Sequence, residues 1–279
     1  MKISFLRGTI LLALLWLMAF LFFGILGSMF SEGNQVVRLS IVQIGIWLVP
    51  ALFYAYFFYD DFLGDLKLKK TGSISNYGWF ILLYATAIPL VGFLYQISYT
   101  LPFPEYLVEM SKNLKSQTDA LVFGFLSGGT LNDLLIALFV MAVLPAICEE
   151  VFFRGVVLNN LVKRTGNIHL AVWLSAIVFS AVHFEVLGFL SRVVLGAALG
   201  YSFVLTKSLW VPIILHFLNN GIIVFAYFSY QKKWISFDPS ETTSVPVWLT
   251  MLCLIAGTVL LRFLLKRYNS GAAANFIRY

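Results

Sequence analysis

The sequence predicts an all-α protein, a polytopic transmembrane bundle of about eight helices with an internal polar cavity. Of its 279 residues, 60% are hydrophobic and only 11% are charged, whereas about a quarter of the residues in soluble domains are charged. Apolar runs of about 20 residues recur along the chain, and a helix needs about this length to cross the hydrocarbon. Charged and polar side chains interrupt several of the later runs, which predicts a polar site inside the bundle.

Apolar length indicates where each span lies. The first run is longer than the core of a signal peptide, so we expect it to be retained as a helix. The connection 98–131 contains the amphipathic stretch "EYLVEMSKNLKSQ", which is typical of a helix at the membrane interface. No internal repeat is evident, so an inverted-repeat transporter gains no support. The expected spans are 9–29, 39–59, 77–97, 132–160, 168–184, 187–206, 210–230 and 246–265.

These spans divide the chain into three expected regions. Residues 1–131 hold the first three transmembrane helices and the interfacial loop. Residues 132–230 form the helical core with the polar site, and 231–279 supply the last helix and a basic tail. The net charge of +6 does not indicate a nucleic-acid partner, because the basic residues lie in short loops and at the chain ends. With both termini cytoplasmic, the inside segments hold about twice as many Lys and Arg residues as the outside segments, as the positive-inside rule favours. We therefore expect an integral, multi-pass protein in contact with membrane lipids.

Three charges lie in the apolar stretch "LPAICEEVFFRGVV", which covers residues 144–157. A charge at the bilayer centre costs about 2.5 to 3.5 kcal/mol on insertion scales, so partners are needed. Glu150 and Arg154 are four residues apart and can form an ion pair on one helix face. Neighbouring helix residues diverge by about 100°, so Glu149 must find its partners on other helices.

Polar side chains in later spans are the candidate partners. His183 lies in "FSAVHF" of the fifth span, and His216 lies in "LHFLNNG" of the seventh, followed by Asn219 and Asn220. A carboxylate, two imidazoles and a carboxamide can activate a water and stabilise an oxyanion, which indicates amide hydrolysis. One Glu and two His can also hold a divalent metal such as zinc and leave a position open for water. The spacing of these residues in the sequence does not distinguish a hydrolysis without a cofactor from one that uses a bound metal.

Three ordered motifs carry a family resemblance. "EEVFFR", "FSAVH" and "HFLNN" resemble the EExxxR, FxxxH and HxxxN/B motifs of the CPBP family of intramembrane proteases, which includes CAAX prenyl endopeptidases and bacteriocin-related immunity proteins. The resemblance implies an endopeptidase, often described as a metalloprotease, that cuts a membrane-associated or lipidated, CAAX-like substrate. It implies that Glu149 is the base, that His183 holds the water, and that His216 and Asn220 stabilise the oxyanion. Glu150 and Arg154 would be the supporting pair. The candidate metal ligands are Glu149, His183 and His216.

Other functions are compatible with the same residues. A non-enzymatic membrane scaffold or a bacteriocin-immunity factor would keep the cavity and use it to bind a peptide. A proton-coupled transporter would use Glu149 as its protonation site. Glu150 and Arg154 can equally form a purely structural ion pair. A protease predicts that changes at Glu149, His183 and His216 each abolish activity and leave expression intact, whereas a scaffold tolerates a neutral residue at Glu149.

Overall fold

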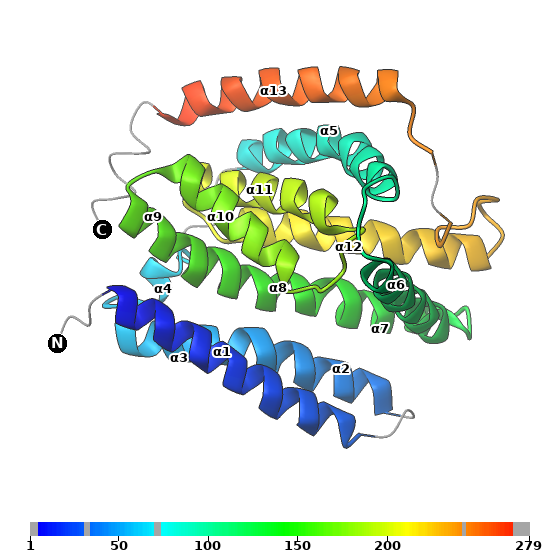
Figure 1. Cartoon of the computed structure of the whole chain (residues 1–279), viewed down its shortest axis with the longest axis horizontal. Helices are drawn as coiled ribbons and strands as arrows, with labels where there is room; N and C mark the ends of the chain where they lie inside the picture. Colours follow the sequence, from blue (N-terminus) through cyan, green and yellow to red (C-terminus); the bar gives the residue numbers. More distant parts are fainter. Residues whose placement is uncertain (1–4, 31–33, 70–73, 242–243, 270–279) are drawn as a thin grey trace.

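A computed structural model describes residues 5–30, 34–69, 74–241 and 244–269, and these residues contain helices and no strand. Most of the helices run roughly along one long axis and form a layered bundle (Figure 1). In the described residues, seven helical segments are long and apolar enough to cross a membrane. The predicted all-α transmembrane bundle is therefore confirmed.

The N-terminal segment forms a helical hairpin. Its first arm is α1 (Phe5–Ser28), and its second arm is the continuous rod of α2 (Gln35–Gln43), η2 (Ile44–Leu48) and α3 (Val49–Phe58). Pro50, near the start of α3, has no N–H to donate to the Ile46 carbonyl four residues earlier, and that carbonyl lies in the π-helical turn η2. A side-chain carbon at Gly45 would lie within 2.5 Å of the Phe23 ring of α1, so the absence of a side chain allows the two arms to pack closely.

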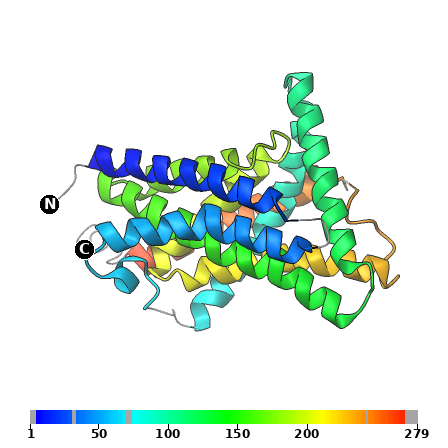
Figure 2. The ribbon, with the colours of Figure 1, turned by 90° about the horizontal axis from the view of Figure 1, so that it is seen from below.

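Two helices connect this hairpin to the core. The short α4 (Phe62–Asp65) precedes α5 (Ile74–Ser98), which crosses the bundle. Helix α6 (Glu105–Leu126) follows, and it lies across one end of the bundle at a steep angle to the other helices (Figures 1 and 2). This helix contains the amphipathic stretch of the 98–131 connection, and its orientation fits the predicted interfacial helix.

The central rod covers 35 residues, from Leu131 to Thr165. It consists of α7 (Leu131–Leu138), η3 (Phe139–Val143), α8 (Leu144–Glu150), η4 (Val151–Leu158) and α9 (Asn159–Thr165). A capping box between Thr130 and Asp133 starts the rod, and Gly166 in the left-handed conformation ends it. Pro145 has no N–H to donate to the Met141 carbonyl, and the π-helical segment η3 contains that carbonyl. The rod is therefore irregular on both sides of Glu149.

The remaining helices pack around this rod. Helix α10 (Ile168–Ala181) and helix α11 (Phe189–Thr206) form a tight hairpin, followed by α12 (Trp210–Gln231) and α13 (Val247–Asn269). A side-chain carbon at Gly196 would lie 3.2 Å from Ala176 and Phe179, and one at Gly200 would lie 3.0 Å from Val172. The two glycines of this G-x-x-x-G spacing thus permit close contact between α10 and α11.

The fifth predicted span differs from the structure in length. Helix α10 has only 14 residues and ends at Ala181, so His183 lies in the turn after the helix and not within a span that continues to residue 184. A helix of 14 residues is about 21 Å long and does not cross the hydrocarbon by itself. The beginning of α1 and the end of α13 lie at the same end of the bundle (Figure 1).

Candidate active site

Glu150 and Arg154 form a buried ion pair on the central rod. Arg154 Nη1 donates to Glu150 Oε1 at 2.7 Å, and the two residues are 1% and 0% exposed. Arg154 Nη2 also donates to the Gly196 carbonyl at 3.0 Å, and the guanidinium lies 4.8 Å from the centre of the Phe179 ring. The close α10–α11 packing at Gly196 thus brings that carbonyl within reach. The predicted ion pair is present and connects the rod to the α10–α11 hairpin.

His216 of α12 completes a second contact to Glu150. Its Nδ1 lies 2.8 Å from Glu150 Oε1. Because an ionised carboxylate only accepts hydrogen bonds, His216 Nδ1 carries the proton and donates it. In the neutral imidazole the other nitrogen, Nε2, is then an acceptor. The Glu150 carboxylate therefore fixes both the orientation and the tautomer of His216.

Glu149 meets a different set of partners, as its position on the helix predicted. Its Oε1 accepts a hydrogen bond from Gln43 Nε2 at 2.7 Å, and its Oε2 lies 4.0 Å from His216 Nε2. Both Glu149 and His216 are buried, at 7% and 6% exposure. The structure therefore brings together Glu149, Glu150, Arg154 and His216, and it adds Gln43, which we did not predict.

His183 approaches the cluster from the turn between α10 and α11. Its Nδ1 lies 2.7 Å from the Phe179 carbonyl, which can only accept, so Nδ1 donates and Nε2 is left as the free nitrogen of the neutral ring. The imidazoles of His183 and His216 lie 5.1 Å and 6.1 Å from the centre of the Phe179 ring. The Glu149 carboxylate is close enough to act electrostatically on His183. His183 therefore borders the cluster without a direct hydrogen bond to Glu149 in this structure.

Several contacts hold the turn that carries His183. Arg192 donates to the carboxylate and to the backbone carbonyl of Glu185, each at 2.6 Å. Ser111 of α6 accepts from the Val186 N–H at 2.8 Å, and Ser180 donates to the Phe189 carbonyl at 2.7 Å. These bonds connect the turn to α6, α10 and α11, and they hold the backbone that carries His183 in place.

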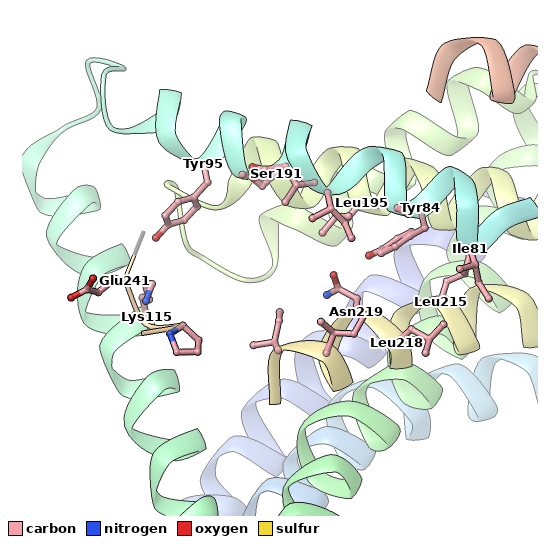
Figure 3. A pocket seen from close by; sticks show the side chains of 17 residues that line it. Ile81, Tyr84, Tyr95, Lys115, Ser191, Leu195, Leu215, Leu218, Asn219 and Glu241 are labelled. Atoms are coloured by element: carbon pink, nitrogen blue, oxygen red, sulfur yellow. Dashed lines mark hydrogen bonds between the residues drawn. The ribbon is translucent and has the colours of Figure 1, made fainter. Parts of the chain in front are cut away.

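Asn219 and Asn220 have different surroundings. Asn220 Nδ2 donates to the Met141 carbonyl at 3.3 Å, the same carbonyl to which Pro145 cannot donate. Asn219 Nδ2 donates to Asn220 Oδ1 at 3.0 Å. Figure 3 shows the Asn219 side chain on the wall of a cavity. The family resemblance implies that Asn220 stabilises the oxyanion. In the structure Asn220 contacts the central rod and Asn219 lines the cavity, and the role of each amide stays a prediction.

A cavity of about 520 Å³ lies beside the charged cluster, between α5, α11 and α12. Tyr84 and Leu215 line it close to the cluster, and Tyr95, Lys115 and Glu241 lie at its other end (Figure 3). Most of the lining is apolar, including Ile81, Ile88, Leu195, Leu218, Ile222 and Ile223. We expected a polar cavity around the catalytic residues. The lining is apolar because Ile, Leu and Val side chains of α5, α11 and α12 face one another there, while the polar groups of the neighbouring cluster are hydrogen-bonded among themselves.

The predicted metal ligands do not form a metal site in this arrangement. In the part of the chain that the structure describes, no group of three His, Cys, Asp or Glu side chains is positioned to hold a metal ion. Glu149 and His216 are neighbours, but His183 does not join them as a third ligand. The expectation of a metalloprotease therefore gains no support from the described residues.

Gln43 is the site residue that sequence analysis missed. It lies in the stretch "IVQIGIWL", where it is the single strongly polar side chain in an apolar run. That isolation was a usable signal, because a polar side chain in a membrane helix needs a partner. The identity of its partner, Glu149, depends on how α2 packs against α8 and is not contained in the local pattern.

Comparisons with known proteins find similarity in the core of this bundle. Residues 131–222 match the family model described as Type II CAAX prenyl endopeptidase Rce1-like, a segment from α7 into α12 that contains all three motifs. The chain is also similar to "Putative membrane peptidase YdiL" of Bacillus subtilis (strain 168), with 29% identity over 85 residues. That match covers 30% of this chain and 34% of the relative, so it spans about a third of the relative's length. No solved structure gives a significant match.

The predicted family resemblance is therefore confirmed for the segment from α7 into α12. The seven long apolar helices and the family match support a multi-pass integral membrane protein, and its segment from α7 into α12 is similar to CAAX-type endopeptidases.

Proposed function

We propose that the protein is an intramembrane endopeptidase in which Glu149 and His216 together activate a water molecule. The observation that carries the proposal is the 4.0 Å separation between Glu149 Oε2 and His216 Nε2 inside a buried cluster. Both atoms are acceptors, so they cannot hydrogen-bond to each other without a donor between them. A water that donates one bond of about 2.8 Å to each of them fits the gap.

This arrangement would orient the water for attack. With both of its hydrogens directed at the two acceptors, the water oxygen presents its lone pairs away from them, toward an incoming carbonyl carbon. The Glu150 carboxylate keeps His216 in the tautomer that leaves Nε2 free to accept. Arg154 compensates the charge of Glu150. Each residue of the motif "EEVFFR" that carries a charge thus has a defined role in the proposal.

The reaction would proceed by addition of water across the peptide bond. The water oxygen bonds to the carbonyl carbon, Glu149 takes the proton that the water loses, and the carbonyl π pair moves to oxygen. The resulting tetrahedral oxyanion collapses, the C–N bond breaks, and the proton passes from Glu149 to the leaving amine. The products are a carboxylic acid and an amine, and transfer of the acid proton to the amine gives a carboxylate and an ammonium ion. We assign His183 to the oxyanion or water, and the carboxamide facing the substrate to the Asn219–Asn220 pair.

The apolar cavity supports a substrate with an apolar portion. It adjoins the cluster through Tyr84 and Leu215, so a chain bound in it would bring a neighbouring peptide bond toward Glu149. A prenyl or acyl chain and the apolar side chains of a transmembrane peptide share this chemistry. We therefore propose a membrane-associated or lipidated, CAAX-like substrate, and we assign both chain ends to the cytoplasmic side by the positive-inside rule.

Cleavage by the purified protein tests this function. The panel consists of an internally quenched, S-farnesylated peptide with a C-terminal CAAX sequence, its unprenylated counterpart, and an apolar transmembrane peptide. We expect cleavage of at least one member, a loss of about 100-fold or more in Glu149→Gln, and unchanged cleavage when a chelator is present. Glu109→Gln is the matched control, because it makes the same change at an exposed position of α6. Full activity of Glu149→Gln, or no cleavage of any peptide, would exclude the proposed reaction.

A further inference from the structure

The N-terminal hairpin reaches the proposed active site through one side chain. Gln43, the last residue of α2, donates from its amide nitrogen to Glu149 Oε1 at 2.7 Å. The donor is the amide nitrogen because a carboxylate oxygen cannot donate. Gln43 lies outside residues 131–222, the segment that matches the family model. A helix outside that segment therefore contacts the central acid of the site.

The hydrogen bond determines which Glu149 oxygen faces His216. A carboxylate can rotate about its last side-chain bond, and that torsion is broad in the absence of a partner. Because Gln43 holds Oε1, Oε2 is the oxygen that lies 4.0 Å from His216 Nε2. Without the amide, the carboxylate can turn and the 4.0 Å gap for the proposed water is no longer maintained.

Gln43 is itself held in place by packing that follows directly in the chain. Trp47, one turn later, contacts Phe152 and Phe153 of η4 with ring centres 5.4 Å and 5.2 Å apart. On the other side, Trp16 of α1 lies 5.8 Å from the Trp47 ring. The Tyr59 hydroxyl donates to the Gly155 carbonyl at 2.8 Å, which anchors the rod α2–η2–α3 at its other end. The amide is thus presented by a rigid element and not by a loop.

We infer that Gln43 is a positioning residue for the proposed hydrolysis, supplied by the N-terminal hairpin, which orients the Glu149 carboxylate toward His216. The inference rests on the proposed function. It assigns to residues outside the family-matched core a direct role in the rate of the chemical step. It does not assign Gln43 any contact with the substrate.

The test compares variants of the full-length protein in detergent, with the peptide that the wild type cleaves best from the panel above. Gln43→Met removes the donor and keeps a side chain of similar size, and Gln43→His restores an N–H the same number of bonds from Cα. Gln35→Met, eight residues earlier on α2, is the matched control. We expect Gln43→Met to lower kcat by about 10- to 100-fold, the range typical for loss of a group that orients a site ligand.

Three readouts separate positioning from a structural role. We expect KM within about twofold of wild type for Gln43→Met, with a decrease of only several °C in its unfolding midpoint from the loss of one hydrogen bond to a charged group. We also expect partial recovery of kcat in Gln43→His and no change in Gln35→Met. A kcat of Gln43→Met within twofold of wild type overturns the inference. The inference is also overturned if both Gln43 variants lose kcat in proportion to a fall in their unfolding midpoints. Failure of the wild type to cleave any peptide instead refutes the proposed function, and the two failures are therefore distinguishable.

Discussion

Replacement of Arg154 by Met should be strongly destabilising. Glu150 Oε1 accepts one bond from Arg154 and one from His216, and Glu150 Oε2 has no hydrogen-bond partner among the described residues. After the substitution, a fully buried carboxylate retains a single donor. The Gly196 carbonyl also loses the hydrogen bond that Arg154 donates to it. Hydrogen bonds to charged groups contribute about 1.5 to 3 kcal/mol each, and removal of one partner of a buried ion pair costs about 3 to 5 kcal/mol.

Thermal unfolding in detergent measures this loss, and the seven Trp residues supply the fluorescence signal. A change of about 3 to 5 kcal/mol corresponds to a decrease in Tm on the order of 10 °C for a protein of this size. The double variant Glu150→Gln/Arg154→Met should recover about half of the loss or more, because the neutral amide oxygen still accepts from His216 and no charge remains buried. A single variant with wild-type Tm, or a double variant less stable than Arg154→Met, would refute the assignment of this pair as a compensated buried charge.

The other predictions concern single residues of the site and the hairpin. Glu149→Gln should lower turnover by about 100- to 10,000-fold and leave Tm within 2 °C or so, because Gln43 can still donate to the new amide oxygen; a parallel fall in Tm would indicate a structural role. Asn220→Ala should lower the free energy of unfolding by about 1 to 2 kcal/mol through loss of its bond to the Met141 carbonyl. Asn219→Ala should preserve stability and lower peptide cleavage. The reverse pattern would contradict the assignment of the two amides. Gly196→Leu should destabilise by about 1 to 3 kcal/mol, since its side chain would enter the space of Ala176 and Phe179; unfolding midpoints equal to wild type would show that the α10–α11 contact can relax.

Much of the fold follows from local properties of the sequence. Length and hydropathy are sufficient for the long spans, because a helix in lipid satisfies its backbone polar groups within the segment. Helix α10 was predicted too long, since the apolar run continues past Ala181 while the helix ends there. The turn after it is stabilised by Glu185, Arg192 and Ser111, and Ser111 is far away in the sequence. The turn after α10 is thus held partly by a contact with α6, and a hydropathy pattern contains no information about such a contact.

The charged cluster shows the same division between local and distant information. The pairing of Glu150 with Arg154 follows from their spacing of four residues on one helix. That spacing also predicted that Glu149 needs partners elsewhere. It did not identify Gln43 as one of them, nor did it predict that His216 Nδ1 binds Glu150. Those contacts depend on how separate helices are packed.

The sequence by itself determined that this chain lies in a membrane, that Glu149, Glu150 and His216 lie on apolar helices, and that the three motifs follow the order of a known protease family. These features depend on composition and on helix periodicity, which act within one segment. Only the tertiary structure decided which carboxylate holds which imidazole, which Asn lines the cavity, and that an N-terminal helix supplies an amide to Glu149. The reason is physical: a hydrogen bond requires two groups within about 3 Å, and between helices this distance is set by the packing of whole surfaces.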